Sequence, residues 1–245
     1  MNSLNWEERL KAHRAKFSSI VPYEKGDKLL LMDFTAGNNE LTEDLVRDTE
    51  KFTRYINASL STAGARYGIG GYNECRTIYS RSDLFDKSRP AVNELQHQVV
   101  DTIEEPRCIH LGVDIWGKPY TKVMAPLDGI VHSFAFNNGF GDYGATIILT
   151  HNLDGQTFHT LYGHLSLNSI KNIQEGDRVK GGDVFAEFGI PFENGQWPPH
   201  LHFQVIIDME DRKGDYPGVC APSEKEKYLN NCPDPDLILN LQYLV

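Results

Sequence analysis

The chain has 245 residues, of which 40% are hydrophobic and 11% aromatic, so we expect one large domain, or a domain with an extension, built on a sizeable core. Its formal net charge at pH 7 is -10, and a chain without a basic surplus is not expected to have a nucleic acid as its main partner. No stretch approaches the roughly 18 consecutive apolar residues of a transmembrane helix, so no membrane partner is expected.

The N-terminus and the cysteines bear on the cellular compartment. The first residues, MNSLNWEERLKAHRAKF, contain no apolar region behind their first charges, which is not typical of a secretory signal. Cys75, Cys108, Cys220 and Cys232 are scattered without a CxxC pair, and this indicates buried or free thiols in a reducing compartment rather than disulfides or a zinc knuckle. We therefore expect a cytoplasmic protein, or an extracytoplasmic one if a signal has been removed.

Residues 1–64 are predicted to form an N-terminal helical extension. Residues 5–17 are charged and predict a first helix, and KLLLMDFTAGN after it predicts one short strand and a turn. A longer helix is predicted over residues 40–62, where Gly64 offers a stop signal. Its apolar stripe consists of Leu41, Leu45, Phe52, Ile56 and Leu60. Residues 65–107 are rich in glycine and arginine and are expected to wrap around the following domain.

Residues 108–245 form the third predicted region, in which short strands alternate with glycine turns. The expected strands lie in IHLGVDIW, GIVHSFAF, ATIILTH, FHTLYGHL, RVKGGDVFAEFG and HLHFQVIID. Residues 152–155, Asn-Leu-Asp-Gly, predict a hairpin turn, and the tail over residues 208–245 is expected to be irregular. The fold class is therefore a mainly antiparallel β core, sandwich- or barrel-like, with an N-terminal helical extension, and α+β overall.

The IHLGVDI segment carries candidate metal ligands. Strand alternation places His110, Gly112 and Asp114 on the face opposite the apolar side chains. Four residues of extended chain span roughly 13 Å, whereas ligands of one zinc ion lie about 2.0–2.2 Å from it. The segment must therefore bend if both side chains bind one ion, and Gly112 stands where a bend would help.

A second candidate group is the His-x-His pair of WPPHLHF. His200 and His202 lie on the same face of a strand, roughly 6.6 Å apart along it, and converge without a bend. The pair fits two metal ligands, a ligand and a catalytic base, or two polar residues on a solvated face. His164, in YGHLS, is expected where a strand meets a loop.

The remaining histidines have no partner at a useful spacing. We interpret His132, His151 and His159 as structural, and His13 and His97 as surface residues. The other four histidines and Asp114 form the set that zinc hydrolysis requires, because three ligands leave an open position for water and further neutral imidazoles can move its proton. That set is His110, Asp114, His164, His200 and His202.

These motifs resemble the LytM/lysostaphin-type zinc metallopeptidases, peptidase family M23. The resemblance rests on HLGVD, YGHLS and HLH followed by Phe, together with APLDGIV, DYGATIILTH and EGDRVKGGDVFAEFG, and covers roughly residues 108–207. It implies a compact antiparallel β core of the duplicated hybrid-motif type, with the site in a groove on one sheet.

Carried over by position, the resemblance implies that His110, Asp114 and His202 bind one zinc ion and that His164 and His200 are the catalytic imidazoles. It implies a zinc metallo-endopeptidase acting on peptides, with glycine-containing and peptidoglycan-related peptides as the expected substrates. The chain as a whole, including GIGGYNECRTIY and PGVCAPSEK, resembles a subgroup sometimes found fused to kinase-like and aminotransferase domains.

Two positions depart from the family pattern. Glu104 stands where a tyrosine commonly precedes the first motif, which leaves Tyr79 as the candidate for that role. The approach to His-x-His is ENGQWPPHLH, in which Trp197, Pro198 and Pro199 replace the usual small residues.

Two other classes of protein are alternatives. A non-hydrolytic β module related to biotinyl and lipoyl domains would need a modifiable lysine at a hairpin tip, and no Met-Lys pair of that kind is present. A cupin-like metal enzyme would use both histidines of His-x-His and a nearby glutamate, for which Glu210 is the candidate. In the peptidase, the N-terminal helices are expected to lie across the groove and limit access.

Overall fold

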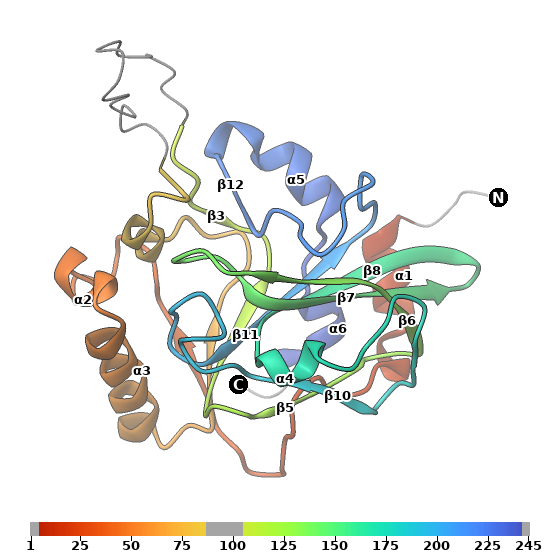
Figure 1. Ribbon diagram of the computed structural model, residues 1–245, viewed down its shortest axis with the longest axis horizontal. Helices are drawn as coiled ribbons and strands as arrows, with labels where there is room; N and C mark the ends of the chain where they lie inside the picture. Colours follow the sequence, from red (N-terminus) through yellow and green to blue (C-terminus); the bar gives the residue numbers. More distant parts are fainter. Residues whose placement is uncertain (1–4, 87–104, 242–245) are drawn as a thin grey trace.

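The computed structural model describes residues 5–86 and 105–241, and its main feature is an eight-stranded sheet (Figure 1). The strand order in this sheet is β1-β2-β4-β11-β8-β7-β6-β9. Its strands are β1 (Leu29–Met32), β2 (Tyr67–Gly70), β4 (Val113–Trp116), β6 (Gly129–Asn137), β7 (Gly144–Leu153), β8 (Gln156–Leu165), β9 (Arg178–Val179) and β11 (His200–Ile206). The β1–β2 pair is parallel, and the other described pairs are antiparallel.

Four short strands and several helices surround this sheet. The short strands pair as β10 (Val184–Glu187) with β5 (Lys122–Met124), and as β12 (Val219–Cys220) with β3 (Ile109–His110). The helices are α1 (Trp6–Ala12), α2 (Glu43–Arg47), α3 (Thr49–Ala63), α4 (Leu167–Ile170), α5 (Lys225–Asn231) and α6 (Asp236–Leu239), with 3-10 turns η1 (Arg14–Lys16), η2 (Thr77–Arg81) and η3 (Pro222–Glu224). Figure 1 shows α2 and α3 at one end of the molecule and α1 at the other. The mainly β fold class with N-terminal helices is thus confirmed.

The two faces of the sheet carry different kinds of side chain, because successive residues of a strand point to opposite faces. On β4, Val113 and Ile115 point into the largest buried apolar cluster, as do Leu201 and Phe203 on β11. The intervening side chains of both strands, Asp114 among them, therefore project from the opposite face. There they lie between two smaller apolar clusters, one built around α3 and the other around the C-terminal segment.

The predicted hairpin turn is confirmed between β7 and β8. Asp154 and Gly155 both have positive φ, 52° and 78°, as a two-residue type I′ turn requires. Asp154 also contacts the N-terminal segment, since its carboxylate lies 2.9 Å from Nε2 of His13. His13 was expected at the surface, but its side chain is only 15% exposed because of this contact.

The N-terminal elements differ from the predictions in two respects. The helix predicted over residues 40–62 is two helices, because Asp48 leaves the helical conformation and its side chain accepts a hydrogen bond from the Lys51 backbone N–H, which caps α3. Residues 65–107 do more than wrap the sheet, since β2 lies inside it between β1 and β4. The predicted boundaries at residues 64 and 107 remain predictions, and the sheet extends across both.

The prediction of an irregular tail over residues 208–245 was wrong. The described part contains β12, η3, α5 and α6. Tyr216, Tyr228 and Cys232 from this segment are buried in the C-terminal apolar cluster, which stabilises it despite its proline and aspartate content.

The prediction for the cysteines was half right. Cys220 and Cys232 are buried free thiols, as expected. Cys75 and Cys108, in contrast, form a disulfide, because a β-bridge between Cys75 and Ile109 brings the two cysteine Cα atoms to 4.7 Å. The 33-residue separation carries no local motif, so the sequence pattern gave no sign of this pairing.

No helix in the described ranges is both long and apolar enough to span a membrane. Glu104 and His97 lie outside the described residues, so the predictions made for them have no structural counterpart.

Candidate metal centre

The HLGVD segment bends between β3 and β4, as the spacing of its two candidate ligands requires. β3 ends at His110 and β4 begins at Val113, so the interruption includes Gly112. A Cβ atom at Gly112 would lie 2.5 Å from Cε1 of His202 and 2.8 Å from the carbonyl oxygen of Phe203. Glycine is therefore needed at this position because the imidazole of His202 fills the space of a side chain.

Three side chains meet at this bend with their ligand atoms in a small triangle. Nε2 of His110 lies 2.9 Å from Nδ1 of His202 and 3.3 Å from Oδ1 of Asp114. Nδ1 of His202 lies 3.1 Å from the same Oδ1. A tetrahedral zinc ion with bonds of about 2.0–2.1 Å separates its ligand atoms by about 3.3 Å. The three atoms therefore have nearly the spacing that one zinc ion requires.

The other hydrogen bonds of the two imidazoles show which ring nitrogens carry a hydrogen and which are free to bind a cation. Nδ1–H of His110 donates to the carbonyl oxygen of Gly71 at 2.9 Å, which leaves its Nε2 as an acceptor. Nε2–H of His202 donates to Oε1 of Gln204 at 3.0 Å, and the Gln204 amide is oriented by donating to the Pro217 carbonyl. Nδ1 of His202 is then also an acceptor. Three acceptor atoms face one another, which is the donor set of a metal site.

Burial sets the protonation states of this group. Burial lowers the pKa of His110 to about 3, so this imidazole is neutral at pH 7, as a metal ligand must be. Burial opposes ionisation of Asp114, but His110 and the Arg76 guanidinium hold the pKa of its carboxyl well below the usual range. The carboxylate is therefore charged at pH 7.

His164 and His200 lie beside the triangle as a stacked pair. Their ring centroids are 4.1 Å apart, and His200 also stacks on Trp116 at 3.9 Å. Nδ1–H of His164 donates to the carbonyl oxygen of Asn194, and that of His200 to the carbonyl oxygen of Pro198, both at 2.8 Å. Both rings therefore present Nε2 as their free acceptor.

The two imidazoles are neutral at pH 7. Burial lowers the pKa of His200 to about 4, and burial with the neighbouring His200 and His202 rings holds the pKa of His164 well below its ordinary value. His164 has a φ of +62°, an unusual backbone conformation for a residue other than glycine, near a register shift between β7 and β8. His164 was expected where a strand meets a loop, but it lies within β8, and its unusual backbone conformation directs its side chain to the site.

One cavity of ≈ 210 Å³ contains the site. Its lining includes the side chains of Asp114, His164, His200 and His202, with Tyr79 and Tyr143 among its aromatic residues. Tyr79 is buried with its ring centroid 6.3 Å from that of His110, so the structure brings this tyrosine to the site. Its role remains a prediction.

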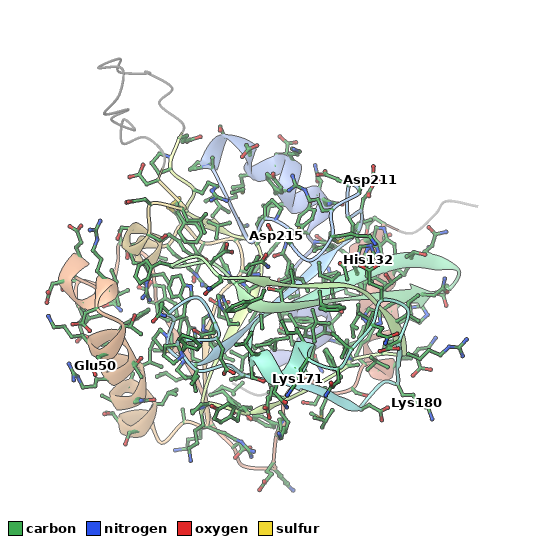
Figure 2. The ribbon with its side chains drawn as sticks, in the orientation of Figure 1. Glu50, His132, Lys171, Lys180, Asp211 and Asp215 are labelled. Carbon is green, nitrogen blue, oxygen red and sulfur yellow. A yellow bond between two sulfur atoms is a disulfide. The ribbon has the colours of Figure 1, made fainter. Side chains whose placement is uncertain are left out.

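The cavity is not lined by the N-terminal helices, which we had expected to lie across it. Among the described residues, none from 5–64 lines it, so the N-terminal helices do not lie across the site. Its lining instead includes residues 212 and 215–219, together with Leu84 and Phe85. Figure 2 shows the same separation, with Asp215 toward the centre of the view and Glu50 on α3 at the outer edge.

The structure explains the Trp-Pro-Pro approach to His-x-His. Trp197 is 3% exposed, and its ring centroid lies 6.1 Å from those of both His164 and His200. Phe52 of α3 and the Arg81 guanidinium pack against other parts of the same indole. The tryptophan thus joins α3 to the imidazoles of His164 and His200, and the carbonyl oxygen of Pro198 fixes the tautomer of His200.

Several contributing residues were missed from the sequence. They are Arg76, Trp116, Tyr143, Asn194 and Gln204. Gln204 and Trp116 carried a signal, since strand alternation places them on the same faces as His202 and Asp114. The other three come from loops or from distant segments, where no periodicity applies.

The cupin-like alternative does not fit this geometry. The ligand triangle contains His202 and not His200, whose Nδ1 is engaged by a backbone carbonyl. Glu210 lies outside the cavity, and its side chain is 39% exposed. His132, His151 and His159 do not line the cavity either, in agreement with their structural interpretation.

Two imidazoles and a carboxylate arranged around one point, beside two further neutral imidazoles in a cavity, fit the arrangement of a metallohydrolase site. Residues 108–214 match peptidase family M23. Residues 108–214 therefore form a domain that matches this metallopeptidase family.

Known proteins similar to the chain include an uncharacterized metalloprotease of Haemophilus influenzae, which is 35% identical over 221 residues. The alignment covers 84% of this chain and 40% of the relative, so the chain spans less than half the length of that protein. A zinc containing peptidase from Vibrio cholerae is 27% identical over 44% of this chain and 29% of its own, with a TM-score of 0.32. The catalytic domain of lysostaphin from Staphylococcus simulans is 23% identical over 71% of this chain and 97% of its own, with a TM-score of 0.39.

Proposed function

We propose that the chain is a zinc-dependent metallo-endopeptidase whose substrates are glycine-containing or peptidoglycan-type peptides. The observation that carries the proposal is the joint geometry of two groups. Three buried acceptor atoms lie 2.9–3.3 Å from one another, and two neutral imidazoles with free Nε2 atoms line the same cavity. The match of residues 108–214 to a peptidase family supports peptide bonds as the target.

His110, Asp114 and His202 would hold the zinc ion. When bound, zinc acts as a Lewis acid that lowers the pKa of a water ligand towards ~7. The protein supplies the remaining proton transfers. His200, held between Trp116 and His164, has the acceptor atom and the fixed ring orientation of a general base.

His164 is assigned the complementary task at the leaving group. His164 lines the cavity beside His200, and the proton removed from the attacking water returns through it to the amine that leaves when the amide bond breaks. The hydroxyl groups of Tyr79 and Tyr143 are the candidate donors to an oxyanion in the same cavity. Both phenols remain protonated at pH 7, because burial raises their pKa values far above the ordinary value.

The test is hydrolysis by the zinc-loaded protein of three substrate classes: purified peptidoglycan, synthetic glycine-rich peptides, and an unrelated unfolded protein. We expect new peptide termini, detected by mass spectrometry, in one of the first two classes. Replacing His200 with alanine should abolish them while the protein stays folded. Absence of cleavage in all three classes by a protein that holds zinc would contradict a peptidase function.

We also propose that the folded chain works in an oxidising compartment, contrary to the cytoplasmic expectation. The Cys75–Cys108 disulfide supports this proposal, because such bonds persist mainly outside the reducing cytosol. A thiol titration of denatured, unreduced protein isolated under acid quench should find two free thiols out of four cysteines. Four free thiols would contradict the proposal.

A further inference from the structure

A short segment outside the peptidase-family region, residues 71–76, forms a second layer behind the metal ligands. It lies beside β3, because Cys75 forms a β-bridge with Ile109, although residues 77–108 separate the two in the sequence. Its contacts reach two of the three candidate ligands, His110 and Asp114. The family match begins only at residue 108, so this layer comes from the chain's own N-terminal region.

Arg76 makes the contact with Asp114. The arginine is 2% exposed, and its guanidinium uses all three nitrogens. Nη1 donates to Oδ2 of Asp114, Nε donates to Oε1 of Glu74 at 2.8 Å, and Nη2 donates to the carbonyl oxygen of Gly71 at 2.8 Å. Such a planar fork has one orientation in which all three bonds form, so the position of Oδ2 is fixed.

The same segment also fixes His110. The carbonyl oxygen of Gly71 that accepts from Arg76 accepts from Nδ1–H of His110 as well. The backbone N–H of His110 donates to the carbonyl oxygen of Glu74 at 3.0 Å, and the Asn73 N–H donates back to the His110 carbonyl at 2.8 Å. The orientation of both ligands therefore depends on one turn of chain.

A covalent bond holds this turn against the ligand-bearing strand. Cys75 immediately precedes Arg76, and its disulfide partner Cys108 stands two residues before His110. The backbone N–H of Arg76 donates to the Cys108 carbonyl oxygen at 2.9 Å, beside the disulfide. Movement of Arg76 away from the metal centre is thus restrained on both of its sides.

We infer that Arg76 is a positioning residue of the metal centre: it occupies Oδ2 of Asp114, so that only Oδ1 is free to bind the ion, and the Cys75–Cys108 bond holds it in place. The inference rests on the proposed metal site. A carboxylate that binds through one oxygen takes one coordination position, which leaves a position open for water. Without the guanidinium, Asp114 turns and offers both oxygens to the ion.

The experiment uses the full chain, freed of metal and titrated with Co²⁺, whose visible absorption is strong in four-coordinate and weak in five- or six-coordinate sites. The variants are Arg76→Gln, which removes the charge and the fork, and Arg76→Lys, which keeps the charge. Arg66→Gln is the matched control, because Arg66 also makes an ion pair, with Asp27 at 2.6 Å, but has no contact with the site.

We expect Arg76→Gln to bind Co²⁺ and Zn²⁺ about 10–100-fold more weakly and to lose most of the visible absorption per bound Co²⁺. Arg76→Lys should lie between this variant and the wild type, and Arg66→Gln should match the wild type in both measurements. Wild-type affinity and absorption in Arg76→Gln would overturn the inference.

A second variant keeps the test decisive if Arg76→Gln does not fold. The Cys75→Ser/Cys108→Ser protein retains Arg76 but lacks the covalent restraint, and should also bind Co²⁺ more weakly with reduced absorption. Unchanged binding in this variant would overturn the role of the disulfide. Failure of the proposed function is a different result, because the wild type itself would then bind no metal or cleave no peptide.

Discussion

Replacement of Gly112 by alanine tests how closely the backbone bend and the metal site depend on each other. The added methyl group would lie 2.5 Å from Cε1 and 2.6 Å from Nε2 of His202, where ordinary contacts begin at 3.4 Å. It cannot relax in the other direction, because the Phe203 carbonyl oxygen is 2.8 Å away. The imidazole of His202 must therefore move by most of an ångström, which breaks its hydrogen bond to Gln204 and removes Nδ1 from the ligand triangle.

We expect Gly112→Ala to lose about 1–3 kcal/mol of unfolding free energy, the usual cost of overpacking a buried position. Zinc affinity should fall by at least about 10-fold, because a ligand and its outer hydrogen bond are displaced together. Competition with a chelating dye measures the affinity, and thermal unfolding measures the stability. Gly155→Ala is the control, since its Cβ would meet nothing within 4 Å and its φ of +78° adds only backbone strain. Wild-type zinc affinity in Gly112→Ala would refute the reasoning.

Three further predictions concern stability and packing. Removal of zinc by a chelator should lower the unfolding temperature of the wild type, because a ligand present at a thousand times its Kd stabilises the folded protein by about 4 kcal/mol. The unfolding temperature of His202→Ala should not change on the same treatment. Trp197→Ala should cost about 3–5 kcal/mol and reduce turnover by loosening His164 and His200, while zinc binding persists; full activity would contradict the packing role. In the folded protein, burial lowers the pKa of His151 from 6.5 to about 4. Unfolding therefore takes up a proton at pH values between these two. The contribution of His151 to the free energy of unfolding should be full above pH 6.5 and decline by up to ~3 kcal/mol as the pH falls to 4. His151→Gln should show a smaller decline in denaturant titrations over that range, and an equal decline would contradict this assignment.

The residues of the candidate metal site could be singled out from the sequence because their spacing and strand periodicity are local properties. Strand alternation placed His200 and His202 on one face, and the need for convergence singled out the bend at Gly112. The split of the histidine pair into a ligand and a catalytic residue came from the family resemblance. In the structure, Nδ1 of His202 lies in the triangle and Nδ1–H of His200 donates to the Pro198 carbonyl oxygen, and the two roles remain predictions.

The second layer of the site could not be predicted, because it depends on contacts between distant segments. Arg76 reaches Asp114 across 38 positions, and Asn194 reaches His164 across 30. The Cys75–Cys108 bond has the same origin, since only the pairing of Cys75 with Ile109 brings the two thiols together. Local composition gave no information on any of these pairings.

In the fold, too, local features could be predicted from the sequence and those that depend on distant contacts could not. The β7–β8 hairpin followed from its turn residues, whose positive φ values select one turn type. The break at Asp48 could not be predicted, because the apolar stripe of the predicted helix continues without interruption past this residue. An aspartate can cap a new helix there or lie inside a continuous one, and the sequence does not distinguish the two. The order in the C-terminal segment was missed because its few apolar side chains are widely spaced, and they are buried only through contacts with β3 and the main sheet.

The central claim is that His202 binds the metal and His164 acts on the substrate. Metal analysis combined with peptide hydrolysis, in the wild type, His202→Ala and His164→Ala, tests it most directly. The account predicts one zinc ion per chain in the wild type and in His164→Ala, none in His202→Ala, and hydrolysis by the wild type alone. Loss of zinc from His164→Ala, or its retention in His202→Ala, would contradict the assignment.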